Sequence, residues 1–190
     1  MKKIGIITNI KFSELSKNFH KTDIIKFVNN VYNNFITQGK LLKSEIILIS
    51  TGNPWIEHVP ISLFLLNEQN KDELDNKYAG LELCVPTCIN YKTKKFLNTH
   101  EGRKLNEIHE NYKLISNIDT LEELSKNIQP NKSNKTNKKT FIKRGFKQAK
   151  TMMINNCDII LVFGFDNLPD TELWNKITCD KYYYSMSSFL

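Results

Sequence analysis

The sequence lacks the long apolar segments and the dense cysteines that mark membrane proteins and small secreted proteins. No hydrophobic run approaches the roughly 20 residues that span a bilayer, and the apolar stretch in MKKIGIITNIKF is too short for a signal peptide. The cysteines are too sparse for a disulfide scaffold and form no C-x-x-C pair. We therefore expect a cytoplasmic protein with no membrane association and with reduced thiols at Cys84, Cys88, Cys157 and Cys179.

Metal-binding spacing is also absent. His100 and His109, with Glu101 and Glu110, do not form the H-E-x-x-H pattern that places two histidines on one helical face. The sequence therefore predicts no metal site, and no other motif in it indicates a cofactor.

Length and composition favour one globular domain. The chain has 190 residues, of which 40% are hydrophobic and 25% charged, which is enough for a substantial core. We expect a single domain over residues 1–190, with a flexible basic loop at about 129–140, where QPNKSNKTNKKT offers no hydrophobic anchor. The abundant Asn, Lys and Ile indicate an AT-rich genome. The net charge of +7 is therefore weak evidence for a polyanionic partner.

Apolar, β-branched runs alternate with segments of helical spacing along the chain. This order predicts an α/β fold, a Rossmann-like doubly wound and mostly parallel sheet with helices on both faces. The predicted strands are Lys3–Thr8, Ile46–Ser50, Leu81–Val85 and Asp158–Phe163. The predicted helices are Thr22–Phe35, Trp55–Asn67, Glu101–Ile115, a short helix after Asp119, Phe141–Asn155 and Thr171–Ile177.

The stretch Ile46–Pro54, IILISTGNP, is the strongest local indication of a ligand site. A strand that ends in a small-residue turn before a helix can present backbone N–H groups to an anion such as phosphate. The alternative is an ordinary turn, in which Gly52 supplies a positive φ and Asn53-Pro54 begins the helix. The other strands would end at the same edge of a parallel sheet, so Thr8, Asn9, Pro86, Thr87 and Gly164 join the candidates.

Four segments of the chain show a family pattern: IGIIT, ILISTGN with the apolar helix after it, LCVPT, and FIKRGFKQAKTMMINNCDIILVFGFD. Together they resemble the SLOG superfamily, the Rossmann-like group that includes DprA-type DNA-binding proteins, YpsA-like proteins and LOG-type phosphoribohydrolases. The sequence departs from the family where Ser50–Asn53 replaces paired glycines and where Gly145 follows Arg144. It also lacks the glycines of the phosphoribohydrolase stretch P-G-G-x-G-T-x-x-E, although Thr171 and Glu172 resemble its end.

The resemblance implies first a binding module or sensor for a nucleotide or a nucleotide-derived small molecule. In this interpretation Arg144 pairs with a phosphate in bidentate fashion. The strand ends and the turns after them line the crevice, with Thr8, Asn9, Ser50, Thr51, Gly52, Asn53, Pro86, Thr87, Gly164, Phe165, Asp166 and Thr171 as candidate ligand-binding residues.

An N-glycoside hydrolase acting on nucleoside monophosphates is the alternative function, so whether the protein is an enzyme stays open. Breaking that bond develops positive charge on the ribose, which a carboxylate stabilises. Glu172 is the candidate catalytic residue and Glu57 the reserve. Glu172 also has a structural interpretation, which we prefer slightly, as a favourable charge in the first turn of the last helix, next to Asp170.

Single-stranded nucleic-acid binding ranks third. Between Lys126 and Lys150 the chain has nine basic residues and no acidic one, and Tyr182–Tyr184 could stack on bases. These two features are far apart in the sequence, and the tyrosines fit a strand or a dimer contact equally well. The sequence leaves a homo-oligomer open.

Overall fold

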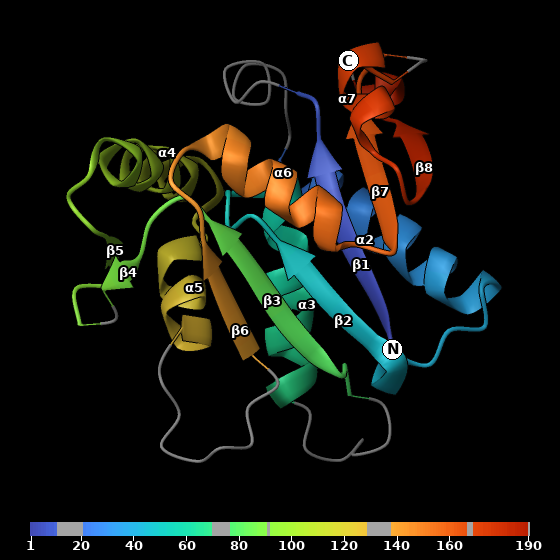
Figure 1. Cartoon of the computed structure of the whole chain (residues 1–190), viewed down its shortest axis with the longest axis horizontal. Helices are drawn as coiled ribbons and strands as arrows, with labels where there is room; N and C mark the ends of the chain where they lie inside the picture. The colour runs from blue at the N-terminus through green and yellow to red at the C-terminus, as the bar shows by residue number, and fades with distance from the viewer. Residues whose placement is uncertain (11–20, 70–76, 91, 129–137, 167–168, 190) are drawn as a thin grey trace.

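The computed structural model describes residues 1–10, 21–69, 77–90, 92–128, 138–166 and 169–189. Its centre is a six-stranded sheet with strand order β6-β3-β2-β1-β7-β8, in which every neighbouring pair is parallel (Figure 1). The strands are β1 Lys2–Thr8, β2 Ile46–Ser50, β3 Gly80–Val85, β6 Lys138–Ile142, β7 Ile159–Gly164 and β8 Asp180–Ser185.

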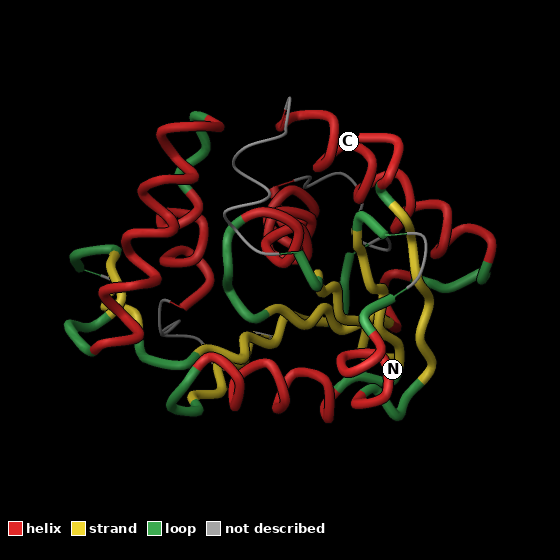
Figure 2. Tube along the Cα trace, turned by 90° about the horizontal axis from the view of Figure 1, so that it is seen from above, coloured by secondary structure: helices red, strands yellow, loops and turns green. Residues whose placement is uncertain are grey.

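Helices cover both faces of this sheet (Figure 2). The α-helices are α2 Lys21–Gln38, α3 Val59–Gln69, α4 His100–Ser116, α5 Thr120–Ile128, α6 Phe146–Asn156 and α7 Thr171–Lys176. Short elements complete the described chain: the 3-10 turns η1 Lys43–Glu45, η2 Trp55–His58 and η4 Ser187–Phe189, and the antiparallel pair β4 Ile89–Asn90 and β5 Lys95–Phe96. The predicted Rossmann-like, doubly wound α/β fold is confirmed.

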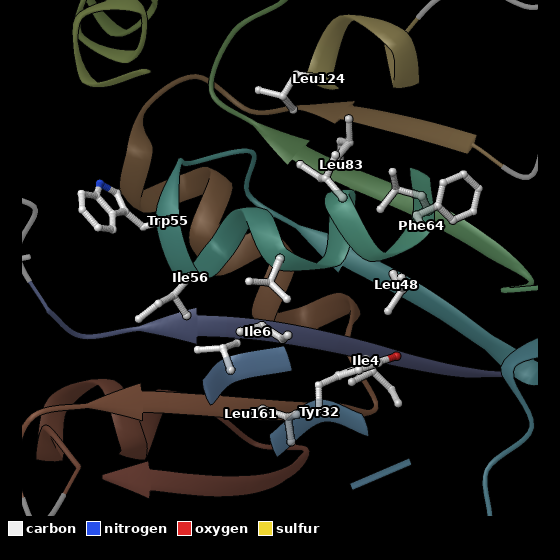
Figure 3. Close-up of a cluster of buried hydrophobic side chains, with 14 of the residues drawn as sticks. Ile4, Ile6, Tyr32, Leu48, Trp55, Ile56, Phe64, Leu83, Leu124 and Leu161 are labelled. Carbon is white, nitrogen blue, oxygen red and sulfur yellow. The ribbon is translucent and has the colours of Figure 1, made fainter. Parts of the chain in front are cut away.

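The central strands are buried on both faces, which explains their continuous apolar sequences. Ile4 and Ile6 of β1 belong to a cluster that α2, η2, α3, α4 and α5 help to build, whereas Ile7 faces a second cluster under α6. Figure 3 shows part of the first cluster, in which Leu48 of β2 and Leu161 of β7 lie on either side of Ile4 and Ile6 of the strand between them, β1. Burying both faces of β1 fixes its register, because a slip of one residue would exchange the two sets of side chains.

The predicted buried helix after Pro54 is present in two parts. It begins as the 3-10 turn η2 and becomes the α-helix α3 at Val59, with Pro60 in the first α-helical turn. Proline is tolerated there because the N–H groups of a first turn have no partner within the helix. Trp55, Ile56 and Phe64 are all buried, as expected for a segment that is apolar on every side.

The start of α6 requires a correction. Its sequence predicted a loop up to residue 140 and a helix from Phe141, but residues 138–142 form the edge strand β6, and the helix starts at Phe146. An edge strand with exposed positions such as Lys139 and Thr140 shows no apolar alternation, so pairing with β3 alone identifies it. Residues 129–137 of the predicted loop lie outside the described residues.

Two predicted helix starts are confirmed by their caps. The Asp170 carboxylate accepts a hydrogen bond from the Leu173 backbone N–H at 2.8 Å, and Asp119 accepts one from Glu122 at 2.9 Å. Tyr182–Tyr184 lie in the edge strand β8, one of the two placements left open for them. In the described part of the chain, none of the helices is both long and apolar enough to span a bilayer.

Candidate functional site

The sheet reverses its winding direction between β1 and β7. From β1 the chain moves through α2 to β2 on one side, and from β6 it returns across the opposite face through α6 to β7 on the other side of β1 (Figure 1). The ends of the two strands are joined by the Thr8 hydroxyl, which donates to the Phe163 carbonyl at 3.0 Å. Open α/β sheets bind ligands outside such a point, at the carboxyl ends of the strands.

A cavity of about 370 Å³ opens beside this point, which we call the central cavity. Four parts of the chain enclose it: the end of β1, the turn and 3-10 helix after β2, α4, and the first turns of α6. Its lining combines apolar and aromatic surface with two lysines and one carboxylate: Thr8, Ile10, Asn53, Pro54, Trp55, Glu57, Lys104, Ile108, Phe146 and Lys150.

Glu57 joins three of these parts through its carboxylate, although only 3% of the residue is exposed. Its Oε2 accepts hydrogen bonds from Thr51 Oγ1 at 2.5 Å and Asn53 Nδ2 at 2.7 Å. Its Oε1 lies 3.4 Å from both the Thr8 backbone nitrogen and the Lys150 Nζ. The end of β1, the turn after β2 and α6 are therefore held together by one side chain.

The environment keeps Glu57 ionised. Burial, the largest influence, raises the pKa of this carboxyl, but the positive charge of Lys150 and the hydrogen bonds from Thr51, Asn53 and Thr8 together lower it below its ordinary value. A carboxylate offers about four acceptor positions, and four donors surround this one. Glu57 thus positions its neighbours and holds one negative charge in the cavity wall.

The small-residue turn after β2 directs its hydroxyl groups inward. Ser50 Oγ donates to the Glu57 carbonyl at 2.5 Å and accepts from the Gly52 backbone N–H at 3.0 Å. Gly52 has a φ of 76°, as the ordinary-turn interpretation required. In the structure, Ser50 and Thr51 are engaged within the protein, and Asn53 is the one residue of this turn that lines the central cavity.

Trp55 follows this turn in a conformation that side chains rarely adopt. Its φ is 74°, in the left-handed region that favours glycine. The residue is 1% exposed, and its ring lies 4.6 Å from the ring of Tyr112 on α4, centroid to centroid. Packing therefore offsets a backbone strain of roughly 1–3 kcal/mol, and such strain is commonly found at functional sites.

Two lysines from different helices supply the positive charge of the cavity. Lys150 on α6 donates to the Thr8 carbonyl at 2.8 Å and lies beside Glu57. Lys104 on α4 is exposed, its Nζ lies 5.9 Å from the ring centroid of Phe146, and no described carboxylate forms an ion pair with it. No motif along the chain marks Lys104, Phe146 or Lys150 as a residue of a small-molecule site, because α4 and α6 come together only in the folded chain.

A second cavity of about 230 Å³ also has Lys150 in its wall. It is lined by Asn9, Lys150, Asp170, Glu172, Leu173 and Lys176, and we call it the second cavity. The side chain of Glu172 is 77% exposed and forms an ion pair with Lys176, whose hydrogen bond and charge lower the pKa of the Glu172 carboxyl. The two proposed catalytic carboxylates, Glu57 and Glu172, therefore line different cavities.

The remaining candidates are divided among several places. Arg144 is exposed in the turn between β6 and α6 and lines neither cavity, so its pairing with phosphate stays a prediction. Gly164 is the last residue of β7, and two residues later the Asp166 carbonyl accepts a hydrogen bond from the Tyr183 hydroxyl at 2.7 Å. Pro86 and Thr87 are buried after β3, Phe165 is partly buried, and Thr171 is exposed at the start of α7.

Two buried histidines lie behind the central cavity and connect η2 with α4 and α5. His58 Nε2 is 2.8 Å from Glu123 Oε2, and His109 Nδ1 is 2.7 Å from Thr120 Oγ1. Burial, followed by the nearby His58, lowers the pKa of His109 to about 3. Within the described ranges, no three His, Cys, Asp or Glu side chains form a group that could hold a metal ion.

Comparison with known proteins gives one informative similarity. The chain is 29% identical over 136 residues to "Uncharacterized protein R261" of Acanthamoeba polyphaga mimivirus. The matched region covers 70% of this chain and 66% of the viral protein, so the chain spans slightly less than two thirds of that relative. No family model matches the sequence. The similarity thus relates the chain to a viral protein whose name carries no activity, and the SLOG resemblance stays a prediction.

Proposed function

We propose that the protein binds a nucleotide or a nucleotide-derived small molecule in the central cavity, as a binding module or sensor. The observation that carries this proposal is the combination of Lys104 and Lys150 with apolar and aromatic surface in one cavity at the carboxyl ends of β1 and β2. A phosphate group is attracted by lysine ammonium groups, and a planar base is accommodated by apolar surface.

Different residues of the cavity lining would contact the phosphate and the base. Lys104, which has no described carboxylate partner, is free to approach a phosphate, whereas Lys150 is fixed between the Thr8 carbonyl and Glu57. Phe146 and Pro54 provide surface against which a base can pack. The volume of about 370 Å³ falls within the roughly 300–1,000 Å³ of small-molecule sites.

Direct binding to a mixed panel tests this function. The purified protein is incubated with nucleoside monophosphates, deoxynucleotides, ADP-ribose and NAD, bound and free material are separated, and both are analysed by HPLC. We expect one class of compound to be retained unchanged. If no compound is retained at millimolar concentration, the proposed function is wrong, and polynucleotide or protein partners become the next question.

Hydrolysis of a nucleotide N-glycosidic bond is the second candidate, favoured by the ionised Glu57 in the cavity wall. A negative charge there could stabilise the positive charge that develops on ribose. Against it, the acceptor positions of Glu57 are already engaged by protein donors. The same panel separates the two functions, because hydrolysis releases a free base. Loss of that release in Glu172→Gln, or in a Glu57→Gln protein that circular dichroism shows to be folded, would then identify the catalytic carboxylate.

A further inference from the structure

The helix α6, which supplies part of the central cavity, also borders a separate groove. It crosses one face of the sheet in front of β1, β2 and β3 (Figure 1). Phe146 and Lys150, one helical turn apart, line the central cavity. Lys147 and Thr151 each follow one of them by a single residue, so they lie on another side of the helix. That side borders a groove of about 640 Å³, which we call the α6 groove and which is lined by Lys143, Lys147, Gln148, Thr151, Met152, Asn155 and Asn156.

The α6 groove is positively charged. The described lining contains two lysines and no acidic residue, and residues 138–157, which carry that lining, include six basic side chains and no acidic one. In the described part of the chain, neither Lys143 nor Lys147 forms an ion pair. The pKa of the Glu172 carboxyl on α7 is lowered by Lys176 and, to a smaller extent, by Lys147, but its ion pair is with Lys176. The charge of the two groove lysines is therefore not neutralised by a described contact.

The composition of the lining indicates what kind of partner fits. Met152 is the one apolar residue among the described lining residues, so an apolar helix would bury little hydrophobic surface there. A second copy of the same face would bring like charges together, which is unfavourable. An anionic partner, by contrast, gains from both lysines.

The spacing along α6 matches a chain of phosphates. Lys147 and Asn155 are eight residues apart in the helix, which corresponds to about 12 Å along its axis. Phosphates of one stacked strand follow one another at about 3.4 Å, so this face spans roughly three or four of them. Thr151 and Asn155 are exposed beside Lys147, and hydroxyl and amide groups are frequent contacts of phosphate and sugar oxygens.

We propose that the α6 groove binds the phosphate backbone of a single-stranded nucleic acid, with Lys143 and Lys147 as the residues that neutralise phosphates. A groove of about 640 Å³ accommodates a few nucleotides of one strand. None of its described lining residues belongs to the central cavity, so this inference does not depend on the proposed function.

Fluorescence anisotropy with a labelled oligothymidylate of about twelve nucleotides tests this surface. Each neutralised phosphate of a single strand adds about 0.7 to the salt slope, so two give at least about 1.4, or roughly sevenfold weaker binding at 200 mM than at 50 mM salt. We expect Lys143→Ala/Lys147→Ala to weaken binding and to reduce this slope by about 1.4. Lys26→Ala/Lys92→Ala removes the same charge at exposed positions of α2 and of the turn between β4 and β5, and should retain the slope.

Three outcomes would overturn the assignment. The first is no binding at about 50 mM salt and 100 μM protein, or equal salt slopes for the two double variants. The second is equally tight binding of polyglutamate with the same number of charges, which would indicate an acidic protein as the partner. The third is competition between the oligonucleotide and a nucleotide retained in the panel, which would place the strand in the central cavity.

Discussion

At the scale of single residues, the charged side chains of the central cavity differ in whether they form ion pairs within the protein. Glu57 and Lys150 satisfy each other and their neighbours, and they fix the shape of the cavity. Lys104 has no described ion-pair partner. Its charge is therefore available to a ligand at little cost to the folded state.

Replacing Lys104 should weaken the binding of phosphorylated compounds. We expect Lys104→Ala to reduce their affinity by about 1.5 kcal/mol, roughly tenfold, because one charge-assisted contact is lost. Calorimetric titration with the compound retained in the panel measures this change. Lys147→Ala is the matched control, since Lys147 is an exposed lysine of α6 outside the central cavity. Equal affinities of the Lys104 variant and the wild type would remove Lys104 from the site.

Replacing Glu57 should destabilise the folded protein even in the absence of a ligand. Glu57→Gln places an amide NH₂ among donors and leaves Lys150 without its negatively charged partner, so we expect a loss of about 3–5 kcal/mol in the free energy of unfolding at pH 7. Urea denaturation measures it, and Glu107→Gln, at an exposed site of α4, is the control.

The difference in the free energy of unfolding between wild type and Glu57→Gln should decrease at acidic pH. The pKa of the Glu57 carboxyl is lower in the folded state than its ordinary value, so its contribution is present above the unfolded pKa and is lost as pH falls through the folded one. The gap between wild type and Glu57→Gln should narrow below about pH 4. A gap that stays constant down to pH 3 would contradict an ionised Glu57.

At the scale of elements, α4 and α5 are attached to η2 and α3 through neutral or paired polar groups. His109 is buried against Thr120 and has a folded pKa of about 3, against an ordinary value of 6.5. Below pH 6.5 the unfolded chain binds a proton that the folded chain excludes. Acid should therefore weaken the attachment of α4 to the rest of the fold.

We expect His109 to steepen the acid sensitivity of the protein. Between pH 6.5 and about 3 it should add up to about 1.4 kcal/mol of lost stability per pH unit, because only the unfolded state is protonated there. His109→Phe, next to Phe96, should remove this slope in urea titrations, and the exposed His100→Gln should retain it. Parallel slopes for wild type and His109→Phe would show that His109 is protonated in the folded protein.

The elements that sequence could predict are those whose burial leaves a pattern. β1, β2, β3 and β7 are apolar because helices cover both of their faces, and the predicted bounds differ from those of the structure by one residue at most at either end. The edge strand β6 was missed because two lysines and a threonine replace that pattern, and the two-residue strands β4 and β5 are too short to produce one.

The residues of the central cavity also differ in whether the sequence could predict them. The ends of β1 and β2 were predicted because strand ends can be read along the chain, and Thr8, Asn53 and Glu57 do line the central cavity. Lys104 and Phe146 could not be predicted, since each lies on a helix whose sequence shows only amphipathic spacing. Their contribution comes from the packing of α4 and α6 around the strand ends, which no local pattern encodes.

At the scale of the whole molecule, the edge strand β8 covers the backbone of β7, the next strand of the sheet. All residues of β7 are buried, and β8 pairs with it along its full length. Without β8, an apolar strand would present unpaired backbone groups to solvent. Such edges promote association between chains.

Removing β8 should therefore convert the protein into an aggregating species. We expect a chain that ends at residue 179 to sediment as large or heterogeneous particles, because the edge of β7 and the contact around the fully buried Met186 are lost. A chain that ends at residue 186 keeps β8 and should sediment as the 190-residue chain does. If the chain that ends at residue 179 also sediments as the 190-residue chain does, β8 is dispensable for protecting β7.

The unusual backbone of Trp55 has an optical consequence. Its indole is locked in the wall of the central cavity against Tyr112, whereas Trp174, the other tryptophan, lies on α7 and contacts Tyr183. In a Trp174→Phe protein, all tryptophan emission would originate from the cavity wall. The protein then carries its own fluorophore at the place where a bound compound would alter polarity and quenching, so occupancy could be followed without any added dye.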